Sequence, residues 1–170
     1  MPKLNEQVNA LAKALKKLAG QAETLKKRIK AEAKKAAADA KKKADRIAAE
    51  GWAAVKSYSM LDEATYIALA EAATGARLPL VGHIPERVAL GTAIDAGQDG
   101  MEHFGRIPMA CSTQEARMLD DLRDVMAAGG DQAAVFEVMA ARNAIVLDSW
   151  DESLCTTVLD RMAGAGLHVS

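Results

Sequence analysis

Apolar residues near the start of the chain recur with a spacing that a helix places along one side. From Leu4 to Ile29 the successive steps alternate between four and three residues. The series is Leu4, Val8, Leu11, Leu15, Leu18, Ala22, Leu25 and Ile29. This is the a/d pattern of a coiled coil, kept over about four heptads. We therefore expect a long helix whose apolar stripe has to be covered by another surface.

The stripe continues in smaller residues after a stutter at Ala33, where a step of four is repeated. Twelve of the 13 lysines precede residue 50, and residues 1–50 carry a net charge of +8 against −9 for residues 51–170. A single globular domain seldom sorts its charges in this way. We predict two parts, a lysine-rich coiled-coil helix or helical hairpin over residues 1–45 and a second segment over residues 46–170.

The lysines of the first part favour a solvated helix face over a nucleic-acid or membrane patch. Alanine and acidic residues separate them, and no aromatic or arginine cluster lies beside them. Aromatic residues make up only 4% of the chain, which argues against a stacking platform for single-stranded nucleic acid. No uncharged run is long enough to span a membrane. We therefore expect neither nucleic acid nor membrane among the partners.

The two cysteines, Cys111 and Cys155, lie far apart and form no CxxC motif. Their number and spacing predict buried thiols in a reducing compartment rather than a zinc knuckle. The first residues also lack the basic and then apolar layout of a secretory signal. Together these features predict a cytoplasmic location.

After residue 50 short apolar runs alternate with helical segments, which is the pattern of parallel βαβ units. Asp62 is the expected N-cap of the first of these helices. The expected strands are 52–59, 78–83 and 99–104, and the helices between them are 61–73 and 85–97. Beyond residue 107 we expect helices over 113–128, 131–141 and 151–165, followed by a strand at 167–170.

Each of the first three strands carries one residue capable of binding a metal, namely Lys56, His83 and His103. The carboxyl ends of parallel strands share one edge of the sheet, so these side chains are expected to converge there. Histidine is the commonest neutral nitrogen ligand, whereas lysine ligates only when deprotonated or carbamylated. Tyr58 shares the strand face of Lys56 and is expected to line the pocket. Glu102 is assigned to the opposite face by period-two alternation, with a structural role.

Three motifs then resemble the amidohydrolase superfamily, most closely its imidazolonepropionase-like and prolidase-like enzymes. They run from Val55 to Ser59, from Leu78 to Pro85 and from Ala96 to His103. The resemblance implies a (β/α)8 barrel that binds one or two divalent metals, often zinc. It implies a carboxylated lysine at Lys56 that bridges the metals, with His83 and His103 as ligands of the second metal.

The chain departs from that family in what surrounds these motifs. It has three histidines, with no His-x-His, and His168 is the only one outside the motifs. The coiled-coil segment stands where the first strands of the barrel belong. We therefore predict an α/β fold, a partial (β/α)8-barrel fragment preceded by a long coiled-coil helix. The alternative is a rearranged, mainly helical fold.

Two functions remain open at this stage. The first is a metal-dependent hydrolase of low specificity, acting on ester, phosphoester or amide bonds of a small molecule through a metal-activated water. Its divalent metal, zinc, would be held by His83, His103 and Lys56, with Lys56 and Tyr58 as catalytic residues. The second is a non-catalytic helical oligomerisation protein, of chimeric or engineered origin, with relic barrel residues. A homodimer through the N-terminal helix is expected in either case.

Overall fold

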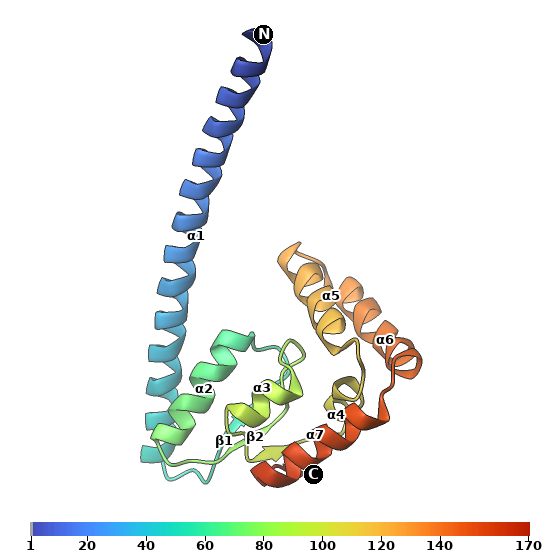
Figure 1. The fold of residues 1–170 in the computed structure, drawn as a ribbon. Coiled ribbons are helices and arrows are strands. Elements are labelled where there is room, and N and C mark those ends of the chain that lie inside the picture. Colours follow the sequence, from blue (N-terminus) through green and yellow to red (C-terminus); the bar gives the residue numbers. More distant parts are fainter. Residues whose placement is uncertain (1) are drawn as a thin grey trace.

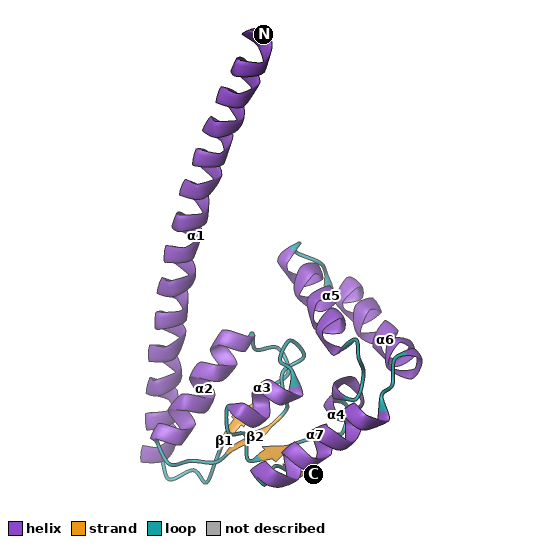
Figure 2. Cartoon of the chain, in the orientation of Figure 1, coloured by secondary structure: helices purple, strands orange, loops and turns teal. Residues whose placement is uncertain are grey.

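The computed structural model describes the backbone of residues 2–170 and the side chains from residue 6 onward. It is mostly helical, with one small sheet (Figures 1 and 2). The helices are α1 (Pro2–Ala49), α2 (Glu63–Gly75), α3 (Leu90–Asp95), α4 (Arg106–Ala110), α5 (Glu115–Ala127), α6 (Gln132–Asp148) and α7 (Glu152–Ala165). The strands are β1 (Val55–Ser57), β2 (Leu80–Gly82), β3 (Gly100–Met101) and β4 (His168–Val169).

The four strands lie in sequence order and every neighbouring pair is parallel. Lys56 lies beside Val81, and Met101 lies between Gly82 and Val169. At least one helix connects each strand to the next, as parallel pairing requires. This arrangement confirms a mixed α/β fold with parallel βαβ units. The eight-stranded barrel to which such units would belong stays a prediction.

The hydrophobic core lies between one face of the sheet and helices α2, α3 and α7. Its buried members from the strands are Val55, Leu80 and Met101. The helices contribute Tyr66, Ala70, Ala73, Leu90, Ala93 and Met162. Alternate strand residues point to the opposite face, where Lys56 and His168 are exposed and Val81 is half-buried. The ionisable strand residues Lys56 and His168 therefore lie on the face away from the helical layer, whereas Ser57 is buried on the core side.

Helix α1 is continuous over its 48 residues, so residues 2–45 form a single helix rather than a hairpin. Its C-terminal quarter packs on α2 through Ala40 and Ala44, which are buried, and Ile47 contacts the core. The rest of α1 extends beyond the globular body (Figure 1). In the described part of the chain, α1 included, we find no helix both long and apolar enough to cross a membrane.

Helix α3 begins at Leu90, five residues later than the start predicted at residue 85. The backbone carbonyls that an earlier start would use are occupied by arginine side chains. Arg142 donates to the Glu86 carbonyl, Arg123 to that of Arg87 and Arg106 to that of Val88. Because these arginines come from distant helices, sequence pattern alone predicted the wrong boundary.

Cys111 and Cys155 form a disulfide between the end of α4 and helix α7. The prediction of two buried free thiols was therefore wrong. The partners are 44 residues apart, and the α5–α6 hairpin between them brings the chain back beside its starting point. Disulfides persist in oxidising surroundings, so the cytoplasmic location inferred from free thiols stays a prediction.

We expect reduction of this disulfide to destabilise the protein by about 3 kcal/mol, because the bond removes the entropy of a long loop from the unfolded chain. Urea unfolding with and without dithiothreitol measures the difference. A variant carrying Cys111→Ala and Cys155→Ala serves as the control, since reductant should not change its midpoint. Equal midpoints for the wild type in both conditions would contradict the prediction.

Candidate metal centre

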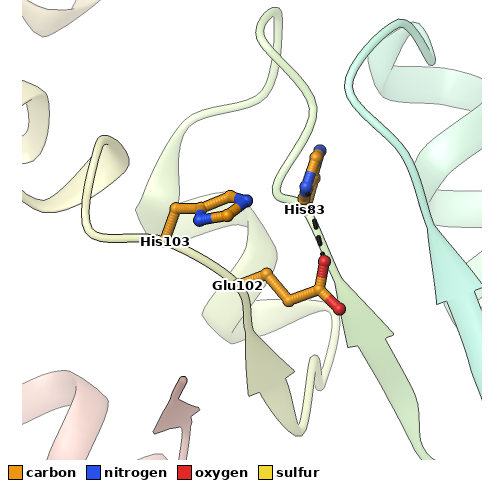
Figure 3. Close-up of side chains that lie close together, drawn as sticks. All are labelled: His83, Glu102 and His103. Atoms are coloured by element: carbon orange, nitrogen blue, oxygen red, sulfur yellow. Dashed lines mark ion pairs between the residues drawn. The ribbon is translucent and has the colours of Figure 1, made fainter.

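Three potential metal ligands meet where strands β2 and β3 end. His83 follows β2 directly, and Glu102 and His103 follow β3. In Figure 3 the two imidazole rings and the carboxylate point toward a common space. One donor atom from each of these residues lies within 4.8 Å of the other two. Parallel pairing of the two strands is what places these residues side by side.

His83 and Glu102 lie within ion-pair distance of each other. The distance from His83 Nε2 to Glu102 Oε2 is 3.4 Å, and the rings of His83 and His103 have centroids 5.0 Å apart. Two imidazoles and one carboxylate make up a donor set that catalytic zinc sites use, with one position left for water. The residues present therefore fit a divalent cation of this kind.

Unusual backbone conformations direct both histidines. Gly82 has φ of +105°, and a Cβ there would lie 2.6 Å from the Ser57 carbonyl oxygen, so only glycine fits against β1. His103 has φ of +68°, a conformation that few residues other than glycine adopt. Its backbone N–H donates to the carbonyl of Ser170 at 3.1 Å. Ser170, which follows strand β4, thus helps to hold His103 in place.

Ser59 contacts the ring nitrogen of His83 that does not face Glu102. Its hydroxyl Oγ lies 2.6 Å from His83 Nδ1. When Nδ1 carries the proton and donates it to this oxygen, the lone pair of Nε2 is free to bind a cation beside Glu102. Such a partner on the other ring nitrogen is a common feature of metal-binding histidines. Ser59 was expected only as the last residue of a strand and was assigned no role, whereas it lies in the loop after β1.

Lys56 reaches the group through Glu102. Its Nζ lies 2.8 Å from Glu102 Oε1, and about half of its side chain is exposed. The hydrogen bond from Lys56 lowers the pKa of Glu102 below its ordinary value, although desolvation opposes the shift. The positive charge of Lys56 and the nearby histidines add to the lowering. Glu102 is therefore a carboxylate at neutral pH, as a metal ligand has to be.

Tyr58 lies against the other side of His83. The two rings stack, with centroids 4.7 Å apart and planes inclined by 23°. Tyr58 and Lys56 also line a second cavity of about 490 Å³, which lies between α1, β1 and α2. The two residues predicted to be catalytic thus stand between this cavity and the histidines.

The structure brings together His83 and His103, as strand order and spacing predicted. It places Lys56 beside Glu102. The assignment of Glu102 to the opposite face was wrong. Strand β3 ends at Met101, so period-two alternation no longer applies to Glu102. His168 lies in β4 and is exposed.

A cavity of about 320 Å³ opens in front of the three ligands. Helices α4 and α6 form its opposite wall, with Arg106, Met109 and Arg142 among the lining residues. Both arginines are 5% exposed and share one carboxylate, that of Glu86. Arg142 lies 2.6 Å from Glu86 Oε2, and Arg106 lies 3.5 Å from the same oxygen. This network ties the helical wall to the loop that follows His83.

We expect Glu86→Ala to destabilise the fold by about 3 kcal/mol, because it leaves two buried guanidinium groups without their carboxylate. Glu63→Ala is the matched control. It removes a carboxylate 2.6 Å from Arg123 in a more exposed ion pair and should cost less than about 1 kcal/mol. Chemical denaturation of the two variants gives the comparison. Similar losses for both would show that the Glu86 network contributes no more than a surface pair.

Comparison with known proteins gives one distant structural likeness. No protein-family model matches the chain, and no curated protein matches it. Among solved structures, bottromycin amidohydrolase is similar, with 16% sequence identity and a TM-score of 0.37. The alignment covers 77% of this chain and 39% of that one. The chain thus spans less than half the length of this hydrolase.

Proposed function

We propose that the protein is a metal-dependent hydrolase in which His83, Glu102 and His103 hold one divalent cation, zinc. The observation that carries the proposal is the convergence of these three donors within 4.8 Å at the carboxyl edge of a parallel sheet. The hydrogen-bonding partner behind His83 supports it further. The resemblance of the three strand motifs to the amidohydrolase superfamily points the same way.

A bound zinc ion would supply an activated water and would polarise a carbonyl or phosphoryl oxygen of the substrate. The protein's own contribution is to fix the ligands and to shape the space beside them. Ser59 holds the ring of His83, and Lys56 keeps Glu102 ionised and oriented. The apolar side chains of Met109 and Val146 line one wall of the cavity.

Lys56 and Tyr58 complete the proposed site. The ammonium of Lys56 is the positive group nearest to the Glu102 carboxylate, so it can also attract a negatively charged oxygen of the substrate. Tyr58 restricts rotation of His83 by stacking on its ring. In the hypothesis based on the amidohydrolase resemblance, Lys56 is itself a metal ligand. That role requires loss of its charge and of the present ion pair.

The proposed substrates are small molecules with an activated ester, phosphoester or amide bond. A cavity of about 320 Å³ suits a small molecule better than a polymer. About half of the Lys56 side chain is open to solvent, and the cavity wall is contributed by several elements. An open site of this kind favours low specificity over tight selection.

A second candidate is a non-catalytic oligomerisation protein. The observation that favours it is the apolar stripe of α1, where six large side chains from Val8 to Ile29 are 56–64% exposed. In that case the histidines would bind no stoichiometric metal. The metal content of the protein therefore separates the two candidates.

We expect about one zinc ion per chain in protein purified without an affinity tag, because the site offers one set of three donors. Elemental analysis measures the ratio. His83→Ala, Glu102→Ala and His103→Ala should each reduce it strongly, whereas His168→Ala, the matched histidine control, should leave it unchanged. A wild-type protein that stays metal-free after incubation with zinc and dialysis would remove the proposal in favour of the second candidate.

Hydrolysis of p-nitrophenyl esters and phosphoesters should stop when a chelator removes the metal and return when zinc is added. The double variant His83→Ala with His103→Ala should lose at least roughly 100-fold in kcat/KM, and Lys56→Met roughly 10-fold. Steady-state kinetics of the reconstituted proteins give these values. Turnover that survives in the double variant would exclude these histidines from the reaction.

A further inference from the structure

The apolar stripe of α1 and its contact with α2 lie along one line of the helix. Leu18, Ile29 and Ala40 are separated by eleven residues each, which is close to three helical turns. Ala40 is 5% exposed because α2 covers it. Leu18 and Ile29 are 60% and 57% exposed. The stripe is therefore covered at its C-terminal end and open over the rest of its length.

The open part is too apolar to be a solvent-facing helix side. Its exposed members are Val8, Leu11, Leu15, Leu18, Leu25 and Ile29. All six lie in the segment that extends away from the body (Figure 1). An isolated helix is only marginally stable in water, and most helical stability in proteins comes from packing of the apolar face. This segment needs a partner helix of matching length.

The residues that flank the stripe suit a second copy of the same chain. In the heptad frame the e and g positions between Gln7 and Gln21 are uncharged, with Ala12, Ala14 and Ala19 between them. Most lysines of the segment, such as Lys13, Lys16 and Lys17, fall on the outer positions. Two identical basic helices can therefore approach along this side without bringing like charges together.

The contact between α1 and α2 restricts the orientation of a second copy along α1. In a parallel, in-register pair, residues 36–47 of the second helix would occupy the side of α1 that α2 already covers. An antiparallel helix avoids this clash, because its N-terminus ends near Ile29 and its globular body lies beyond the far end. The helix dipoles also oppose each other favourably in that orientation.

The antiparallel register also fits the side chains. With Leu15 opposite Leu18 of the second copy, Val8 faces Leu25 and Leu11 faces Ala22. Every a residue then meets a d residue. Leu11 of one copy then fills the space beside the small Ala22 of the other. Two alanines facing each other would leave a void there. At the flank, Arg28 meets the neutral Gln7.

We propose that two copies of this chain form an antiparallel coiled-coil dimer through residues 8–29 of α1, with the two globular bodies at opposite ends. Because α2 covers the stripe near Ala40, the N-terminus of the second helix has to end before that point, which sets the register. The proposal is independent of metal binding, since the coil lies away from His83, Glu102 and His103.

Sedimentation equilibrium tests the association. The full-length protein should sediment at twice its chain mass of 18.0 kDa. Leu15→Lys with Leu18→Lys should raise the dimer dissociation constant at least roughly 100-fold, because charges would enter the paired stripe. Asn9→Lys with Thr24→Lys is the matched control on the outer face and should stay dimeric. A monomeric wild type, or a dimeric stripe variant, would overturn the proposal.

Cross-linking tests the orientation. L11C in one chain and A22C in another should form a disulfide-linked pair on oxidation when the two proteins are mixed, since these positions face each other only in the antiparallel register. L11C alone should not cross-link to itself. The native cysteines already pair with each other and do not compete. Self cross-linking of L11C without reaction between L11C and A22C would show a parallel dimer and sink the proposed arrangement.

Discussion

The carboxylate of Glu86 is the contact on which the surroundings of the candidate site depend. It lies between the guanidinium groups of Arg106 in α4 and Arg142 in α6. Burial lowers the pKa of Arg106 to about 10, with Glu86 opposing the shift, so the arginine stays charged at neutral pH. A buried charge of this kind is tolerated only when it is paired and hydrogen-bonded. The pairing therefore holds the helical wall against the loop that carries His83, and it keeps the cavity in front of the ligands.

The apolar stripe of α1 is covered by the body at one end of the helix and exposed at the other. Near residue 40 small alanines let α2 approach α1 closely, and the stripe becomes part of the core. Toward the N-terminus the residues are larger and the body no longer reaches them (Figure 1). The globular part thus folds around a short section of a much longer helix. The long exposed section is the one we propose to pair with a second copy of the chain, while the candidate chemistry lies at the sheet edge.

Much of the local structure could be predicted from the sequence. The positions of the four strands, their parallel order and the convergence of His83 with His103 followed from short apolar runs separated by helical segments. Asp62 was expected to cap α2, and its side chain accepts a hydrogen bond from the Thr65 backbone. What could not be predicted were contacts between distant residues. Glu102 was misassigned because strand β3 is only two residues long, and the Cys111–Cys155 disulfide depends on how α4 meets α7.

The sequence by itself determined the elements whose signal is periodic. A helix or a strand is specified by neighbours a few residues apart, so the helical conformation of the N-terminal part and the strands could be predicted directly. That the N-terminal part is one helix and not a hairpin came from the structure. Tertiary structure decided which side chains share the site and which part of the stripe is covered. Ser59 and Lys56 act there through His83 and Glu102, which lie more than twenty residues further along the chain. Their distances depend on how the strands pack, and no local spacing encodes that packing.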